Sequence, residues 1–318
     1  MEKGTQAIYL ICLIFLLGSC AARQPTADVI IRNPNPVSMP ILVSGAREAN
    51  SEISGIPQYA VLASLAYEAD SSGAISCGGE LVRPSGWRSV SGLEASKIFP
   101  PTPAYRMKIS GLSYRVFERS GRGGGRRFAI VFRGTSFNSP GDWYSNSRWI
   151  TRLNPVTWDQ YQQVRSLVAS LEAALELRYG ANFELVAVGH SLGGGLAQQA
   201  AYASRRIQQV YAFNTSPVTG ATSIDQRNTD LSRRGDVLHR VYESGEVLAG
   251  IRWASRRVLP LSKANPRIIE YRFNFRQSSR SQGGGGAIGE HGMRQVACDL
   301  ICRVERGLSP EQCGTRLR

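Results

Sequence analysis

Apolar residues follow the clearest pattern in residues 157–178, where they recur every three or four positions. Val164, Val168, Leu171 and Leu175 fall on one face of a helix with this period, and mainly polar and charged side chains occupy the other face. The pattern predicts a long amphipathic helix that packs one face against a core.

Shorter runs of β-branched and aromatic residues predict strands. Residues 112–118 and 127–132 are joined by a glycine-rich turn and predict a β-hairpin. Residues 183–188 are apolar over most of their length, which is typical of a strand buried on both faces. Further strands are expected at 210–213 and 237–241.

Helical patterns alternate with these strands and cover residues 59–67, 196–203 and 294–306. Strands that are separated by helices pair in parallel, because each helix returns the chain to the same edge of the sheet. We therefore expect an α/β fold in which a mostly parallel central sheet is flanked by helices.

The N-terminus has the features of a secretory signal. A charged start at Lys3 precedes an apolar run over residues 7–17, which is short for a membrane span. The tetrapeptide LGSC at 17–20 resembles the bacterial lipobox, whose cysteine is cut free and acylated. The resemblance implies a signal peptide over 1–19 and a lipoprotein anchored through Cys20. An ordinary cleaved signal with an incidental cysteine is the alternative.

The segment after the lipobox is rich in proline and polar residues. This composition predicts a lipidated N-terminus and tether over 20–50, followed by a single folded domain over 51–318. Ala21 follows the cysteine where some such lipoproteins have aspartate, and the resemblance then favours the outer membrane. We expect an exported protein that is anchored to a membrane, probable hosts being bacteria with an outer membrane.

Arginine dominates the charge of the chain. The formal net charge is +14, and only four of the 38 basic residues are lysines. Because arginine binds phosphate through two parallel hydrogen bonds, contact with anionic lipid surfaces is one interpretation. The arginines are scattered along the chain, so a general compositional bias is the alternative. Nucleic acid is a poor partner for an exported protein.

Four cysteines lie beyond the expected tether, at Cys77, Cys298, Cys302 and Cys313. An even number in an oxidising compartment predicts disulfides. Cys298 and Cys302 lie one turn apart on an expected helix, so a bond between these two is the least expected pairing. A zinc site is the alternative, but the spacing does not fit one and no histidine is close after Cys302.

The sequence GHSLG at 189–193 lies between an expected strand and an expected helix. A sharp turn there lifts a serine hydroxyl clear of the sheet, and the flanking glycines avoid clashes. This context is typical of a nucleophile elbow with Ser191 as the nucleophile. The alternative is a small residue in an ordinary turn, because G-x-S-x-G arises by chance in a glycine-rich chain.

A serine nucleophile needs a base, and the chain contains three histidines. His190 precedes the serine and is assigned to packing, whereas His239 lies in a strand pattern typical of the core or an edge. His291 follows a glycine-rich loop near the C-terminus, which fits the order serine, acid, histidine. His291 is therefore the expected base.

The acid is expected between the serine and the base, beyond the end of a strand. Asp236 comes before the strand pattern at 237–241 and so lies at its wrong end. Glu243 and Glu246 follow that pattern, and the residues alone leave both of them open.

Several stretches of the chain resemble the class 3, or fungal-type, lipases. They are YAVLASLAY at 59–67, IVFRGT at 130–135, GDWYSN at 141–146, VGHSLGGGLA at 188–197 and FNTSP at 213–217. The resemblance spans about residues 57–295 and implies an α/β-hydrolase fold that acts on lipid esters.

The same resemblance implies roles for further residues. The family's acid is an aspartate in a pattern similar to R-V-x-x-x-x-D, and this position falls on Glu246, with Glu243 as the alternative acid. The backbone N–H groups of Thr135 and Leu192 are implied as the oxyanion hole. The aromatic-rich segment 136–155 lies where similar lipases carry a lid.

These features together predict a membrane-anchored serine hydrolase that cleaves lipid esters through an acyl-enzyme, without a metal or an organic cofactor. Glycerophospholipids surround the expected anchor, so a phospholipase is favoured over a triacylglycerol lipase. One alternative is an envelope lipoprotein that uses the scaffold only to bind a lipid or a protein. Another is a hydrolase of small esters or thioesters.

Overall fold

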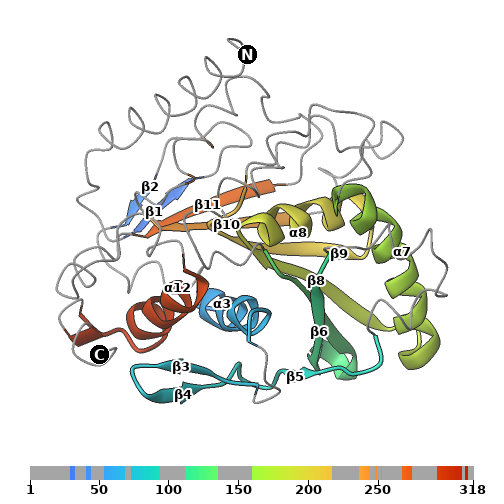
Figure 1. Cartoon of the computed structure of the whole chain (residues 1–318), viewed down its shortest axis with the longest axis horizontal. Coiled ribbons are helices and arrows are strands. Elements are labelled where there is room, and N and C mark those ends of the chain that lie inside the picture. The colour runs from blue at the N-terminus through green and yellow to red at the C-terminus, as the bar shows by residue number, and fades with distance from the viewer. Residues whose placement is uncertain are drawn as a thin grey trace, which may run out of the picture.

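A central β-sheet forms the core of the described part of the chain, and the candidate site lies at its edge (Figure 1). The structure is a computed structural model, and it describes residues 29–32, 41–43, 54–68, 73–93, 112–134, 160–216, 236–243, 248, 252, 267–273, 292–309 and 312–313. Within these residues the sheet has nine strands, in the spatial order β2 (Ile41–Val43), β1 (Val29–Arg32), β11 (Arg267–Phe273), β10 (Val237–Glu243), β9 (Ile207–Phe213), β8 (Phe183–His190), β7 (Arg126–Phe132), β6 (Tyr114–Ser120) and β5 (Arg88–Ser89). A separate hairpin is formed by β3 (Ile75–Cys77) and β4 (Glu80–Val82).

Helices cover both faces of this sheet. They are α3 (Ile56–Leu65), α7 (Gln160–Tyr179), α8 (Leu192–Ala203) and α12 (Met293–Leu300), with a π-helical turn η6 (Ile301–Glu305) that continues α12 and a short 3₁₀ turn η1 (Arg122–Gly124). Figure 1 shows α3 and α12 packed side by side on one face, and α7 and α8 on the other. Of the helices that the structure describes, none combines the length and apolar character needed to cross a bilayer.

The strands β7 to β11 run parallel to one another and follow their order along the chain. The strands β6 and β1 flank them and pair antiparallel with β7 and β11. The carboxyl ends of the parallel strands therefore share one edge, which is where open α/β sheets place functional groups. The predicted α/β class with a mostly parallel, helix-flanked sheet is confirmed, and it is compatible with an α/β-hydrolase fold.

The strand β8 is apolar at every position from Leu185 to Val188 because helices cover both of its faces. Val186 and Val188 face α3 and α12, whereas Leu185 and Ala187 face α7 and α8. Successive side chains in a strand point to opposite faces, so a strand covered on both faces needs apolar residues at every position.

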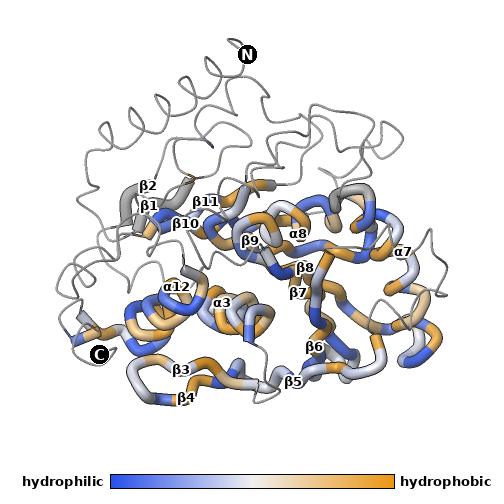
Figure 2. Tube along the Cα trace, viewed as in Figure 1, coloured by the Kyte–Doolittle hydropathy of each residue, from blue (hydrophilic) through white to orange (hydrophobic). Residues whose placement is uncertain are grey.

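The helix α7 is amphipathic, as its sequence predicts. Val164, Val168, Leu171 and Leu175 are buried against the sheet. In Figure 2 the colour of α7 alternates between hydrophobic and hydrophilic along its length. Gly180 ends the helix with φ 79°, a backbone conformation that glycine adopts without strain.

Some strands were missing from the prediction. β11 is a central strand that was not foreseen, because its apolar alternation is interrupted by charged residues such as Glu270. β1 and β2 come from the segment expected to be a tether, and they extend the sheet beyond β11. Their short β-branched runs, VIIR and ILV, carry the strand signal that the surrounding prolines obscured.

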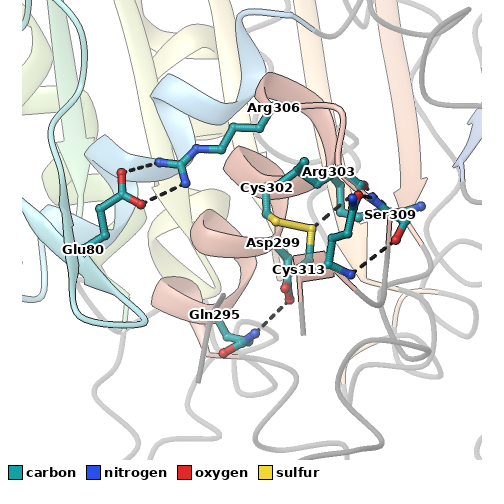
Figure 3. The surroundings of a disulfide bond; sticks show 10 residues. Glu80, Gln295, Asp299, Cys302, Arg303, Arg306, Ser309 and Cys313 are labelled. Carbon is teal, nitrogen blue, oxygen red and sulfur yellow. Dashed lines mark hydrogen bonds and ion pairs between the residues drawn. A yellow bond between two sulfur atoms is a disulfide. The ribbon is translucent and has the colours of Figure 1, made fainter. Parts of the chain in front are cut away.

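Two disulfides link the cysteines as the sequence led us to expect. Cys77 of β3 pairs with Cys298 of α12, and Cys302 pairs with Cys313. The corresponding Cα–Cα distances are 5.5 and 5.8 Å, within the usual range for disulfides. Figure 3 shows the second bond beside Asp299, with Arg306 extending away to Glu80.

Candidate functional site

The turn between β8 and α8 has an unusual backbone at Ser191. This residue has φ 56° and ψ −124°, a region that residues other than glycine rarely occupy. Ser191 stands at the N-cap of α8, yet it makes no side-chain capping hydrogen bond. Capping serines normally have an extended backbone and bond to the first turn of the helix. Helix capping therefore does not account for the strain at this serine.

Close backbone contacts hold this turn against the neighbouring strand. A Cβ added to Gly193 would lie 2.8 Å from both Arg133 C and Gly134 N, beside the carbonyl of Phe132. Only glycine lets the first turn of α8 approach the end of β7 so closely. The N-terminus of α8, including the backbone N–H of Leu192, is thereby fixed beside the carboxyl end of β7.

The next strand also fixes the serine. The N–H of Ser191 donates to the carbonyl of Phe213 at 3.0 Å, and the N–H of Ser216 donates to the carbonyl of Ser191 at the same distance. Both backbone groups of Ser191 are thus occupied by β9 and the loop that follows it. The side-chain hydroxyl of Ser191 is therefore the polar group that the turn can present to a ligand.

Tyr67, two residues beyond the end of α3, joins the ends of β7 and β8. Its hydroxyl accepts a hydrogen bond from the N–H of Gly134 at 3.0 Å and lies 2.9 Å from Nδ1 of His190. Burial raises the pKa of Tyr67, and the Gly134 hydrogen bond and the charge of Arg133 oppose this shift only in part. The phenol therefore stays protonated, and its hydroxyl shares a hydrogen bond with Nδ1 of His190.

The loop after β9 is tied to the end of β10. Asn214 has φ 39°, a conformation that asparagine tolerates better than most residues. Its N–H donates to the carbonyl of Val241 at 2.8 Å, and its side-chain oxygen accepts the N–H of Glu243 at 2.9 Å. Glu243, the last residue of β10, is 5% exposed.

A buried network of polar side chains also holds the loop that follows β9. Arg240 Nε donates to Gln198 Oε1 at 2.9 Å, and Gln198 Nε2 donates to Thr215 Oγ1 at 3.0 Å. Arg240 also lies 3.8 Å from the carboxylate of Glu270 on β11. Because buried charges are unfavourable unless they are paired, this arrangement fixes α8, β10, β11 and the loop relative to one another.

The structure describes three of the predicted site residues: Ser191, Leu192 and Glu243. The N-terminus of α8 brings Ser191 and Leu192 together, and Glu243 ends a strand two places along the sheet. The remaining predicted residues, Thr135, Glu246, His291 and Cys20, lie outside the described residues, as does the segment 136–155.

The order of the strands agrees with the order expected of the site residues. The chain leaves the carboxyl ends of β8, β10 and β11 in turn, and these are separate strands of one parallel sheet. Ser191 follows β8, Glu243 ends β10, and residue 291 follows β11 and directly precedes α12 in the sequence. This topology can bring a nucleophile, an acid and a base to one edge of the sheet.

His190 and His239 both contact tyrosine side chains within the fold. His190 is buried and contacts Tyr67, in agreement with its predicted packing role. His239 stacks on Tyr211 with ring centroids 4.6 Å apart, and its Nδ1 lies 3.2 Å from the Tyr271 hydroxyl. The part of the chain that the structure describes contains no cluster of three or more residues suited to a metal ion.

Several residues around Ser191 were missed by the sequence analysis. Tyr67, Asn214, Gln198 and Arg240 carry most of the hydrogen bonds described above. Tyr67, Asn214 and Arg240 lie in stretches that resemble the class 3 lipases, but their roles could not be read from those stretches because their partners are distant in the sequence. The Tyr67 hydroxyl, for example, meets partners that lie 67 and 123 positions away.

Comparison with known protein families finds a match over most of the chain. Residues 58–257 match the family model described as the Tle-like phospholipase domain, of the phospholipase-like kind. The matched range includes Tyr67, the parallel strands β7 to β10, and the Ser191 turn. No curated protein matches the chain.

Proposed function

The chain belongs to the family of Tle-like phospholipase domains, and from this premise we propose that it hydrolyses carboxylic esters of phospholipids with Ser191 as the nucleophile. The family supports a lipid-ester hydrolase. The serine mechanism, the identity of its residues and the choice of phospholipid over triacylglycerol are our proposal.

The backbone of Ser191 is the observation that carries this proposal. Its strained conformation with φ 56° persists although no capping hydrogen bond requires it. We interpret the turn as a nucleophile elbow, in which strain presents the hydroxyl at the carboxyl edge of the sheet. The adjoining N-terminus of α8 supplies unsatisfied backbone N–H groups and a favourable dipole for a negative charge.

The proposed reaction has two stages. His291 removes the proton of Ser191 as Oγ attacks the ester carbonyl carbon, and the oxyanion binds the N–H groups of Leu192 and Thr135. The C–O bond to the glycerol oxygen then breaks, and His291 protonates that oxygen. Water, deprotonated by His291, attacks the acyl-enzyme and releases the fatty acid with Ser191 restored.

Glu246 is the proposed acid, which orients His291 and stabilises its cation. Its place in the class 3 lipase pattern supports this role. Glu243 is the alternative, supported by its position at the carboxyl end of β10 and by the hydrogen bond from its N–H to Asn214.

We further propose export and lipidation at Cys20, with contact between arginine side chains and anionic lipids. The two disulfides support an oxidising location, because such bonds are rare in the bacterial cytoplasm. A membrane-anchored enzyme would meet phospholipids as the surrounding esters.

A fluorophosphonate probe tests the nucleophile directly. The adduct should map to Ser191, and Ser191→Ala should lower ester turnover at least about 10³-fold without changing the circular dichroism spectrum. Ser170→Ala is the matched control, since this serine lies on the exposed side of α7 and bonds only within its own helix. Unchanged turnover in Ser191→Ala would contradict Ser191 as the nucleophile, whereas no labelling and no turnover in the parent protein would favour a binding scaffold.

A substrate panel and two glutamate variants complete the test. Phospholipid vesicles, lysophospholipid, triacylglycerol emulsion and short p-nitrophenyl esters separate the substrate classes, and activity on short esters alone would indicate a small-ester hydrolase. Glu246→Gln should lower kcat at least about 10²-fold, more than Glu243→Gln does, because a neutral amide cannot stabilise the imidazolium. The reverse order would assign the acid to Glu243.

A further inference from the structure

Tyr67 occupies the junction of three elements that meet beside Ser191. It follows α3, and its hydroxyl bonds to Gly134 beyond β7 and to His190 at the end of β8. The ring is also edge-on to the imidazole of His190, with centroids 5.7 Å apart. A structural tyrosine of the core needs one partner for its hydroxyl, whereas this one connects two strand ends.

We propose that Tyr67 is a positioning residue for ester hydrolysis, whose hydroxyl holds the Gly134 peptide and thereby sets the position of the oxyanion donor that follows it. This inference rests on the proposed function of Ser191. It deepens that proposal by adding a residue that touches neither the substrate nor the reacting atoms.

The space around Gly134 supports this role. A Cβ added there would lie 2.5 Å from the carbonyl oxygen of His190, 2.6 Å from the Tyr67 hydroxyl and 3.2 Å from Cβ of Ser191. The Gly134 peptide therefore packs directly against the serine turn. Small displacements of this peptide would change the distance between Ser191 and any donor on the next residue.

The hydrogen bond of Gly134 also decides which N–H groups are available. Its N–H is directed to the Tyr67 hydroxyl, so it is not a free donor for a substrate oxyanion. The next peptide N–H along the chain, that of Thr135, is the donor that we propose on independent grounds. By engaging the Gly134 amide, Tyr67 fixes the peptide that directly precedes the proposed donor.

The hydroxyl itself is fixed from both sides. It accepts from the N–H of Gly134 and shares a second hydrogen bond with Nδ1 of His190, so two partners restrain its position. Arg133, with its guanidinium 5.5 Å from the ring centroid, further restricts the ring. The rigid support is the kind of preorganisation that a donor to a transition state requires.

The test is Tyr67→Phe, which removes one oxygen and keeps the ring. We expect kcat for a phospholipid or p-nitrophenyl ester to fall about 10- to 100-fold with KM within about twofold, because the donor acts only on the transition state. The affinity for a boronic acid that mimics the tetrahedral intermediate should weaken by a similar factor. Tyr114→Phe is the matched control, since it removes a phenol hydrogen bond to the Leu93 carbonyl, on the outer side of β6.

Rates are expressed per site that reacts with the fluorophosphonate probe, so that misfolded protein does not enter the comparison. A loss of kcat that disappears after this correction would overturn the inference, as would a raised KM with unchanged kcat. Equal kcat in the variant and the parent would overturn it too. If the parent enzyme itself fails to label at Ser191, the proposed function fails before Tyr67 is tested.

A second pair of variants leaves Tyr67 in place. His190→Leu removes the hydrogen-bond partner of the Tyr67 hydroxyl, whereas His190→Asn retains a polar atom near the position of Nδ1. We expect kcat per labelled site to fall more in His190→Leu than in His190→Asn. Combining Tyr67→Phe with His190→Leu should lower kcat no further than Tyr67→Phe alone. Fully additive losses would overturn the shared role of these residues.

Discussion

The two ends of the proposed catalytic machinery are held in place by different means. The Ser191 turn is fixed by backbone hydrogen bonds to β9 and by glycine contacts to β7, all within the parallel sheet. The helix α12, which begins two residues after the proposed base, is fixed to the hairpin β3–β4 by a disulfide. One region relies on close packing of consecutive elements, and the other combines packing against α3 with a covalent link.

This difference follows from the position of each element in the fold. The serine lies between a central strand and its own helix, so neighbouring strands surround it on both sides. The helix α12 follows the last strand and packs against α3, on the outer side of one face of the sheet. Because α12 lies outside the sheet instead of between two of its strands, the cross-link to β3 adds a restraint to its packing against α3.

The largest expected effect comes from breaking that covalent link. Replacing Cys77 and Cys298 with alanine should lower the free energy of unfolding by about 4 kcal/mol, because the bond joins residues 221 positions apart and restricts a very long unfolded loop. Urea unfolding followed by tryptophan fluorescence measures the change.

The second disulfide provides the comparison for this experiment. Cys302 and Cys313 are separated by only 11 positions, so replacing them should lower the free energy of unfolding by about 3 kcal/mol. A variant that lacks both pairs should match the stability of the parent protein measured in dithiothreitol. If neither pair changed the stability, covalent restraint would not be what holds α12.

Crowding the serine turn should lower the stability less than removing the Cys77–Cys298 bond does. Gly193→Ala places a Cβ within 2.8 Å of the backbone at Arg133 and Gly134, which must move apart. We expect a loss of about 3 kcal/mol in stability and at least a tenfold loss of kcat, since the N-terminus of α8 shifts with it. Thermal unfolding and ester hydrolysis report the two losses.

The control for this variant is Gly55→Ala at the start of α3. A Cβ at Gly55 would have no atom within 4 Å, and its φ of −85° suits any residue. Its stability should stay within about 1 kcal/mol of the parent. Similar losses in both variants would argue against close packing as the restraint on Ser191.

The sequence analysis succeeded where the signal is local. The β8 strand, the Ser191 turn and α8 are contiguous, and apolar periodicity with two glycines was enough to predict their arrangement. The hairpin of β6 and β7 was predicted for the same reason, since its turn and both strands form one segment.

The sequence analysis failed where a residue acquires its role from distant partners. β11 was missed because Glu270 reads as a break in a strand, although Arg240 makes its burial acceptable. The role of Tyr67 depends on two strand ends that only the folded sheet brings together. Pattern and composition carry no information about such contacts.

The smallest expected effect concerns pH and again lies in α12. Asp299 is 2% exposed, its Oδ1 has no hydrogen-bond partner among the described residues, and Gln295 donates to its Oδ2 at 3.0 Å. Burial raises the pKa of Asp299 to about 7, although Gln295 and the charge of Arg303 act in the opposite direction. Figure 3 shows this carboxylate beside the Cys302–Cys313 bond.

A raised pKa in the folded state means that folding favours the protonated acid. The contribution of Asp299 to stability should be greatest below about pH 4, decline as the pH rises to about 7, and stay constant above that value. Asp299→Asn carries no charge, so it should gain about 2 kcal/mol over the parent at pH 8 and little at pH 4. Urea unfolding at both values measures this difference, and a gain that is equal at the two pH values would show that ionisation of Asp299 does not weaken the attachment of α12.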